Sequence, residues 1–213
     1  FGPDGEFTFE GEGTAQDPYR IEDAQDMRMF GLLVSTGKYQ DAHFRLEDDI
    51  DMGDTRYMPA GEFNGVFDGG GHNISNLNIS SESENTGLIG FLNGGTVKDL
   101  GIESGTISGG ARVGAIAGRT MYATIRNCYN KAEVSGSNDI GGIAGMFNNS
   151  VMENCFNWGD VHAEVESVGG LIGGANRSID PSTPTIITNC YSIGNATAGV
   201  QYAGTLIGYD EST

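Results

Sequence analysis

The sequence contains one motif that is repeated several times, and this repetition strongly limits the folds that the chain can adopt. The phrase is clearest in CYNKAEVSGSNDIGGIAG, CFNWGDVHAEVESVGGLIG and CYSIGNATAGVQYAGTLIG, which begin at Cys128, Cys155 and Cys190. The closing glycines of such units lie at positions 90, 118, 145, 173 and 208, in steps of 28, 27, 28 and 35 residues. A constant period of this length is typical of a chain built by stacking one supersecondary unit.

A second set of positions repeats with nearly the same period. The phrases ISNL, VKDL, IRNC, MENC and ITNC end at positions 77, 100, 128, 155 and 190. Each unit holds about three short segments of β-branched or small apolar residues, separated by Gly, Asn and Ser. One unit cannot bury its own apolar face, whereas stacked units can. We therefore predict an all-β fold, a right-handed parallel β-helix (β-solenoid) of about six coils of ~28 residues.

Stacking requires each column of equivalent positions to be chemically uniform. We expect three apolar columns: Leu88, Ile116, Ile143, Leu171 and Leu206; Ile107, Val134, Val161 and Ala196; and Ile74, Val97, Ile125, Met152 and Ile187. The cysteines continue a column begun by Leu77 and Leu100, so we interpret them as buried hydrophobes. Strict alternation cannot point both Ile125 and Cys128 inward, so we expect a bend between them. The corner residues would be Asn76, Asp99, Asn127, Asn154 and Asn189, with stacked amides.

The first forty residues follow a different pattern. Apolar residues at Met27, Phe30, Leu33 and Val34 have helical spacing. We expect a helix over 23–36 that covers the open end of the solenoid. The predicted organisation is an N-terminal segment with a capping helix over 1–40 and one continuous solenoid over 41–213. The C-terminal end shows no comparable cap, and a looped insertion is expected at 175–185, where two prolines occur. We expect the chain to be part of a larger polypeptide.

Charge and composition argue against several partners and fold classes. Asp and Glu outnumber Lys and Arg by 29 to 11, which gives a formal net charge of −18. Repulsion from phosphates argues against nucleic acid. No apolar run approaches the ~20 residues of a membrane span, so membrane insertion is not expected. Glycine, at 35 of 213 residues, lacks the three-residue period of collagen.

Metal sites and cofactors have little support in the sequence. The acidic run DDIDMGD offers Asp49, Asp51 and Asp54 as weak candidates for Ca²⁺. It does not match the EF-hand loop, and a solvated strand face is the competing interpretation. The three cysteines form no CxxC pattern, and the three histidines lie in different columns. We predict no cofactor.

Several phrases resemble those of GLUG-motif proteins. They are FEGEGTAQDPYRIEDAQDMRMF, FNGVFDGGGHNISNLNI and TGLIGFL, followed by VGAIAG, NCYNKAEVSG and GGIAG. The resemblance covers about residues 9–209 and implies a module of a bacterial cell-surface or secreted protein, such as an adhesin-like protein or the non-peptidase region of an immunoglobulin A peptidase. It therefore implies an extracellular location and supplies no catalytic motif.

Three functions remain open from sequence. A non-catalytic module for adhesion, ligand binding or spacing is favoured, because the repeat region offers few outward acids with aligned partners and no nucleophile context. The alternatives are a polysaccharide lyase or hydrolase and an accessory region of a secreted peptidase. Alternation from the cysteine column points one set of aromatics outward, and these form the predicted binding site for a surface glycan or protein: Tyr129, Phe156, Trp158 and Tyr191. A purely structural role for this column is the competing interpretation.

Overall fold

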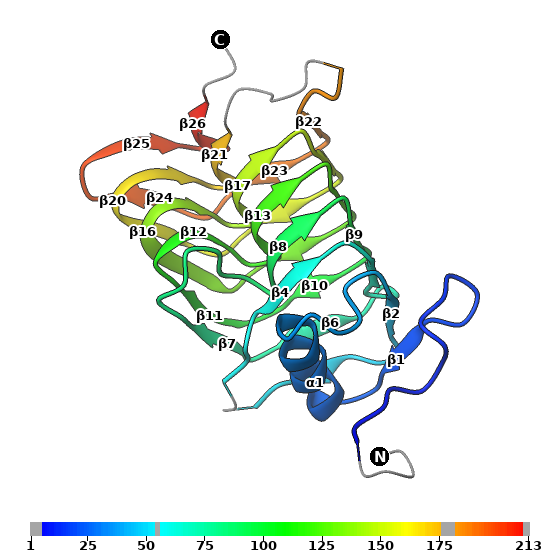
Figure 1. Cartoon of the computed structure of the whole chain (residues 1–213). Helices are drawn as coiled ribbons and strands as arrows, with labels where there is room; N and C mark the ends of the chain where they lie inside the picture. Colours follow the sequence, from blue (N-terminus) through cyan, green and yellow to red (C-terminus); the bar gives the residue numbers. More distant parts are fainter. Residues whose placement is uncertain (1–5, 54–55, 176–181, 211–213) are drawn as a thin grey trace.

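The computed structural model describes residues 6–53, 56–175 and 182–210, and it confirms the β-solenoid (Figure 1). The chain winds into stacked coils, and every strand pair within its four sheets is parallel. Each full coil contributes one strand to three of the sheets and either one or two strands to the remaining sheet, so a coil has four or five strands where the sequence suggested about three. One additional strand arises because the chain bends at Asn127, between the strands Thr124–Arg126 and Tyr129–Asn130.

The sheets run along the solenoid axis and are named A to D in the order in which a coil visits them. Sheet A contains β1 (Tyr19–Ile21), β2 (His43–Leu46), β5 (Val66–Asp68), β9 (Thr96–Lys98), β14 (Thr124–Arg126), β18 (Val151–Glu153) and β22 (Ile186–Thr188). Sheet B contains β3 (Ile50–Asp51), β6 (Asn73–Ser75), β10 (Gly101–Ile102), β15 (Tyr129–Asn130), β19 (Phe156–Asn157) and β23 (Tyr191–Ser192).

Sheets C and D complete each coil. Sheet C contains β7 (Leu77–Ser80), β11 (Gly105–Ser108), β12 (Ala111–Gly114), β16 (Glu133–Gly141), β20 (Val161–Gly169), β24 (Ala196–Ala198) and β25 (Gln201–Gly204). Sheet D contains β4 (Ala60–Phe63), β8 (Ile89–Asn93), β13 (Ala117–Met121), β17 (Ala144–Asn148), β21 (Ile172–Ala175) and β26 (Ile207–Asp210). Strands β16 and β20 are longer than the other strands of sheet C. Their second halves pair with β12 and β25 and lead the chain toward sheet D (Figure 1).

The apolar columns stack as expected over most of the chain. Ile107 pairs with Val134, Val134 with Val161, and Val161 with Ala196. Full burial of each Ile or Val side chain in this column contributes about 1.5–3 kcal/mol. The column of Leu88, Ile116, Ile143, Leu171 and Leu206 also follows the coils. Its members are fully buried except Leu206 in the last coil, which is 39% exposed.

The prediction was wrong for two residues of the first repeat, Ile74 and Leu77, which were assigned to columns that they do not join. Val97 stacks on Phe67 rather than on Ile74, which instead pairs with Ile50 and Ile102 in sheet B. Leu77 pairs with Gly105 and therefore does not begin the cysteine column. The phrase ISNL lies one corner later in its coil than VKDL does. The two phrases look alike because each has an apolar residue at its first and at its fourth position, although they lie at different corners of the coil.

The predicted bend and its amide ladder are present. Asp99, Asn127, Asn154 and Asn189 all have φ of 52° to 53°, a left-handed conformation that Asn and Asp tolerate. Each amide nitrogen donates to the side-chain oxygen of the coil before, at 2.7, 3.0 and 3.2 Å. Asn76 is the exception: it occupies the next corner and donates to Asp51. A second amide ladder, which sequence analysis missed, is buried: Asn130 donates to Asn157 at 2.8 Å.

The capping helix is confirmed almost to the residue. Helix α1 (Ala24–Ser35) begins after Asp23, whose carboxylate accepts from the backbone amides of Gln25 and Asp26. It lies across the N-terminal end of the solenoid (Figure 1). Phe30 is fully buried, with its ring 4.8 to 5.6 Å from those of Phe44, Phe63 and Phe67. No helix within the described ranges is long and apolar enough to cross a membrane.

The closing glycine of the repeat has a steric cause. Residues Arg112, Asp139, Ser167 and Tyr202 are equivalent and all left-handed, and each turns the chain back toward sheet D. The backbone of this turn passes directly over the glycine of the next coil. A Cβ on Gly145 would lie 2.4 Å from the carbonyl carbon of Arg112, and one on Gly173 would lie 2.2 Å from that of Asp139. Only glycine fits there without moving the backbone.

We predict that Gly145→Ala lowers the free energy of unfolding by about 2–3 kcal/mol, because backbone atoms cannot yield as a flexible side chain would. Gly94→Ala is the matched control: Gly94 has φ of +71° but open space around its Cβ, so strain alone should cost about 1 kcal/mol. Denaturant unfolding of both variants measures the difference. Equal losses would show that the turn does not impose the clash.

Candidate ligand-binding face

The predicted aromatic site lies on the outer face of sheet B, at its C-terminal end. Tyr129, Phe156 and Tyr191 occupy one register position on β15, β19 and β23. The rings of Tyr129 and Phe156 are 5.1 Å apart at 6°, and those of Phe156 and Tyr191 are 5.4 Å apart at 10°. The outward stack expected from alternation is therefore present, because parallel in-register strands repeat equivalent side chains once per coil.

Neighbouring rings in this stack cover most of one another's faces. Phe156 has one neighbouring ring on each side, nearly parallel to its own. The Tyr129 ring lies against Gly101 of the coil before, where a Cβ would come within 2.3 Å of its Cζ. Ring edges rather than a row of open faces therefore line this part of the surface.

Trp158 provides a more open aromatic surface beside the stack. Its side chain is 46% exposed, and its ring lies 5.3 Å from Phe156 at 43°. The Lys131 ammonium lies 5.3 Å from the Trp158 centroid and 5.2 Å from that of Tyr129. The sequence did not indicate the role of Glu103, which binds Lys131 at 2.7 Å and accepts from the Tyr129 hydroxyl at 2.8 Å.

This contact shifts two pKa values in opposite directions. Hydrogen bonds from Lys131 and Tyr129 lower the pKa of Glu103. Burial raises the pKa of Tyr129 to about 12, and the hydrogen bond to the Glu103 carboxylate adds to the effect. Glu103 therefore stays ionised and Tyr129 stays protonated at neutral pH. The pair fixes the first ring of the stack and the position of Lys131.

The outer face of sheet B changes character along the axis. Trp158, Tyr191 and Ile193 are exposed at its C-terminal end, and Ile193 reaches 68%. At the N-terminal end the same face carries Asp49 and Asp51. An apolar patch of this kind on an acidic module is a candidate contact surface.

The acidic candidates for a metal site are engaged with protein groups. Asp49 accepts from the Asn73 amide at 3.0 Å and lies 3.4 Å from His72 Nδ1. Asp51 accepts from the Gly53 amide and the Asn76 side chain, both at 2.8 Å, and these bonds lower its pKa. Asp54 lies outside the described residues. Among those described, no three His, Cys, Asp or Glu side chains gather into a metal-binding group.

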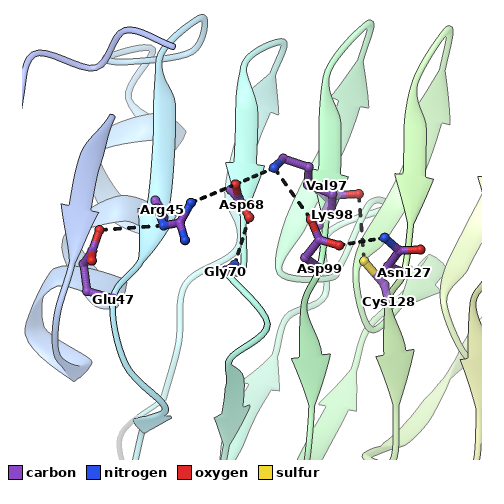
Figure 2. A network of polar contacts seen from close by, with 9 residues as sticks. All are labelled: Arg45, Glu47, Asp68, Gly70, Val97, Lys98, Asp99, Asn127 and Cys128. Atoms are coloured by element: carbon purple, nitrogen blue, oxygen red, sulfur yellow. Dashed lines mark hydrogen bonds and ion pairs between the residues drawn. The ribbon is translucent and has the colours of Figure 1, made fainter. Parts of the chain in front are cut away.

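The outer face of sheet A carries a charge ladder that sequence analysis did not identify (Figure 2). Asp68 lies between Arg45, at 3.5 Å, and Lys98, and Lys98 also contacts Asp99 at 3.6 Å. Burial raises the pKa of Asp68, but the hydrogen bond from Lys98 and the nearby positive charges outweigh burial, so the pKa is lowered overall. Signs alternate along this ladder, and we interpret it as structural.

The three cysteines are free thiols and stack in the coil interior at one corner. The backbone amide of Cys155 donates to Cys190 Sγ at 3.3 Å. The hydrogen bond with Cys128 raises the pKa of Cys155, and that with Cys155 raises the pKa of Cys190. Protonated thiols are poor nucleophiles, so this column agrees with the predicted core role.

A groove of about 410 Å³ crosses the outer face of sheet C, and sequence analysis missed it. Its polar lining comes from β11, β16, β20 and β24 and the residues that flank them: Thr106, Glu133, Ser135, Asp160, His162, Asn195 and Thr197. The available signal was a polar residue on each side of Ile107, Val134, Val161 and Ala196. Two of these polar residues, Glu133 and Asp160, are acids on successive coils, although few aligned outward acids were expected.

Comparison with known proteins confirms the resemblance to GLUG-motif proteins. Residues 109–135 match the model of the GLUG motif. In an alignment 140 residues long that covers 56% of this chain, the sequence is 33% identical to halomucin of Haloquadratum walsbyi, and the match spans 2% of halomucin. A solved Bacteroides ovatus structure, provisionally named an immunoglobulin A1 protease, is similar with a TM-score of 0.80 and 27% identity, over 96% of this chain and 66% of that one. The chain spans less than two thirds of either relative.

We predict that Glu103→Gln lowers the pKa of Tyr129 from about 12 toward the ordinary tyrosine value, because the neutral amide removes the negative charge that opposes ionisation. The measurement is an ultraviolet pH titration, with Tyr129→Phe as the reference from which the Tyr129 signal is obtained. An unchanged titration in Glu103→Gln would mean that burial alone sets this pKa.

Proposed function

We propose that this GLUG-repeat chain is a non-catalytic module of a larger cell-surface or secreted polypeptide, and that it serves adhesion through the exposed end of its aromatic face. The observation that carries the proposal is the exposure of Trp158, Tyr191 and Ile193 on one face of a strongly acidic solenoid. Aromatic groups on a rigid sheet offer contact area at little cost in conformational entropy. The partner class is a surface glycan or protein.

The relatives support a setting within a longer chain. The match to halomucin occupies a small fraction of that protein, and the Bacteroides ovatus chain extends beyond the aligned part. The second similarity favours one alternative role, an accessory region of a secreted peptidase. In both roles the solenoid would hold or present a partner, and its stacked coils suit it to act as a rigid spacer.

The chemistry of the site supports a non-catalytic role. The raised pKa values of Cys155 and Cys190 keep these two thiols protonated, and Arg45, Asp68 and Lys98 of sheet A pair with one another. One observation favours the alternative of a polysaccharide-acting enzyme: Glu133 and Asp160 line the same groove. Glycoside hydrolysis uses two such carboxylates across one bond. Both are solvent-exposed, however, whereas a general acid usually needs burial to raise its pKa.

We predict that Trp158→Ala weakens binding of the module to its target surface by about tenfold, since loss of one aromatic contact removes about 1–2 kcal/mol. Surface plasmon resonance against glycan arrays and intact bacterial or host cells measures the change. Tyr122→Ala is the control, because Tyr122 is 44% exposed, much as Trp158 is, and lies between β13 and β14, away from sheet B. Binding that survives both Trp158→Ala and Tyr191→Ala would favour the spacer role.

We predict that the purified module releases no product from uronic-acid polymers, neutral glycans or peptides. Reducing-end and free-amine assays provide the measurement. Turnover that disappears in Glu133→Gln or Asp160→Asn would instead identify an enzyme and contradict the proposal.

A further inference from the structure

The groove on sheet C is separate from the aromatic face. Asp160 lies on sheet C and Trp158 on sheet B, and Gly159 turns the chain between them. Gly159 allows this tight corner because a Cβ there would lie 1.9 Å from the carbonyl oxygen of Ala132. The groove crosses four successive strands, which at the usual strand spacing is about 14 Å. It therefore suits an elongated ligand that lies along the solenoid axis.

Hydrogen bonds hold several groups of the groove in place before any ligand binds. Asp160 Oδ1 accepts from the backbone amide of Asn195 at 2.9 Å and from its side chain at 3.0 Å. The Thr106 hydroxyl donates to Asn78 at 3.1 Å, which leaves its oxygen free to accept. His162 Nδ1 lies 3.0 Å from the Thr197 hydroxyl. Such preorganisation lowers the entropic cost of binding a polar ligand.

The centre of the groove is an array of hydrogen-bond acceptors. Within the described part of the chain, the side chains of Glu133 and Ser135 have no hydrogen-bond or ion-pair partner, and they lie between Thr106 and Asp160 along the axis. Among the residues that the structure describes, no Lys or Arg lines the groove. A ligand that fits must bring many donors and no negative charge. Hydroxyl-rich sugars have this property, and uronic or sulfated sugars do not.

A peptide strand is a poorer occupant. Strands β11, β16 and β20 each pair with a neighbour on both sides, so their backbone groups are not free for strand addition. An extended peptide also presents side chains to one face about every 6.6 Å, which does not match coils spaced by about 4.8 Å. The apolar residues of the lining, Val134 and Val161, point into the core. Recognition must therefore come from polar side chains alone.

We propose that this groove binds an uncharged, hydroxyl-rich glycan chain along the solenoid axis, with the Glu133 and Asp160 carboxylates accepting from sugar hydroxyls. Ser135, Thr106 and Asn195 complete the contacts. This binding site goes beyond the proposed adhesion through the aromatic face, since it uses another sheet and another chemistry. Hydrogen bonds to a charged acceptor are the strongest of this set.

The test is isothermal titration calorimetry with neutral hexasaccharides of glucose, mannose, galactose and xylose, each compared with a galacturonic acid hexasaccharide and a glucosamine hexasaccharide. We expect at least one neutral probe to bind, and the galacturonic acid probe to bind at least tenfold more weakly. Glu133→Ala and Ser135→Ala should each weaken neutral binding, Glu133→Ala by about tenfold. Glu153→Ala, an exposed acid on sheet A, is the matched control and should have no effect.

The outcomes separate this inference from the proposed function. Failure of every neutral probe, binding of the glucosamine probe alone, or full binding by Glu133→Ala would overturn the groove proposal. Trp158→Ala should leave groove binding unchanged, so loss of binding in that variant would assign the sugar to the aromatic face instead. Cleavage of a bound hexasaccharide would support the groove as a glycan site and contradict the non-catalytic function.

Discussion

Backbone hydrogen bonds between successive coils hold this solenoid together, and they require each coil to place equivalent residues directly above those of the coil before. The Val134 amide, for example, donates to the carbonyl of Asp160 one coil along. Because the pairing is parallel and in register, a change at one position meets its own equivalent on both sides. The apolar columns, the amide ladder at Asn127 and the closing glycine of each repeat all follow from this constraint.

The same register makes the candidate binding face. Because the coils stack, equivalent aromatic rings also stack, namely those of Tyr129, Phe156 and Tyr191. Each ring then covers most of the face of its neighbour. Stacking therefore stabilises the sheet and reduces the aromatic area available to a ligand. Trp158 escapes this limit because its neighbours in the column are Lys131 and Ile193 rather than aromatic rings. A break in the column leaves the surface on which the proposed adhesion depends.

Charge is arranged differently on different sheets. On sheet A, Asp68 pairs with Arg45 and with Lys98 of the two neighbouring coils (Figure 2), and Arg126 of the following coil then repeats the sign of Lys98. On sheet C, Glu133 and Asp160 follow one another with the same sign, and cross-strand neighbours of like charge cost stability. Donors from a bound sugar would offset that cost. The ion pairs of Asp68 support a structural role for that part of sheet A, whereas Glu133 on sheet C has no ion pair among the described residues and is available to a ligand.

The sequence alone determined the features that depend on local pattern. The period fixed the coil, the apolar spacing and Asp23 fixed helix α1, and alternation from the cysteine column oriented Tyr129, Phe156 and Tyr191. Only the tertiary structure decided which residues meet across coils. It moved Ile74 and Leu77 out of their expected columns, brought Glu103 to Tyr129 and Lys131, and gathered the groove around Glu133. These contacts join residues about one coil apart, and their register depends on the exact length of each corner. A difference of a few residues between similar phrases changes the sheet on which a side chain lies. The average repeat length does not show such differences, so these contacts could not be predicted from it.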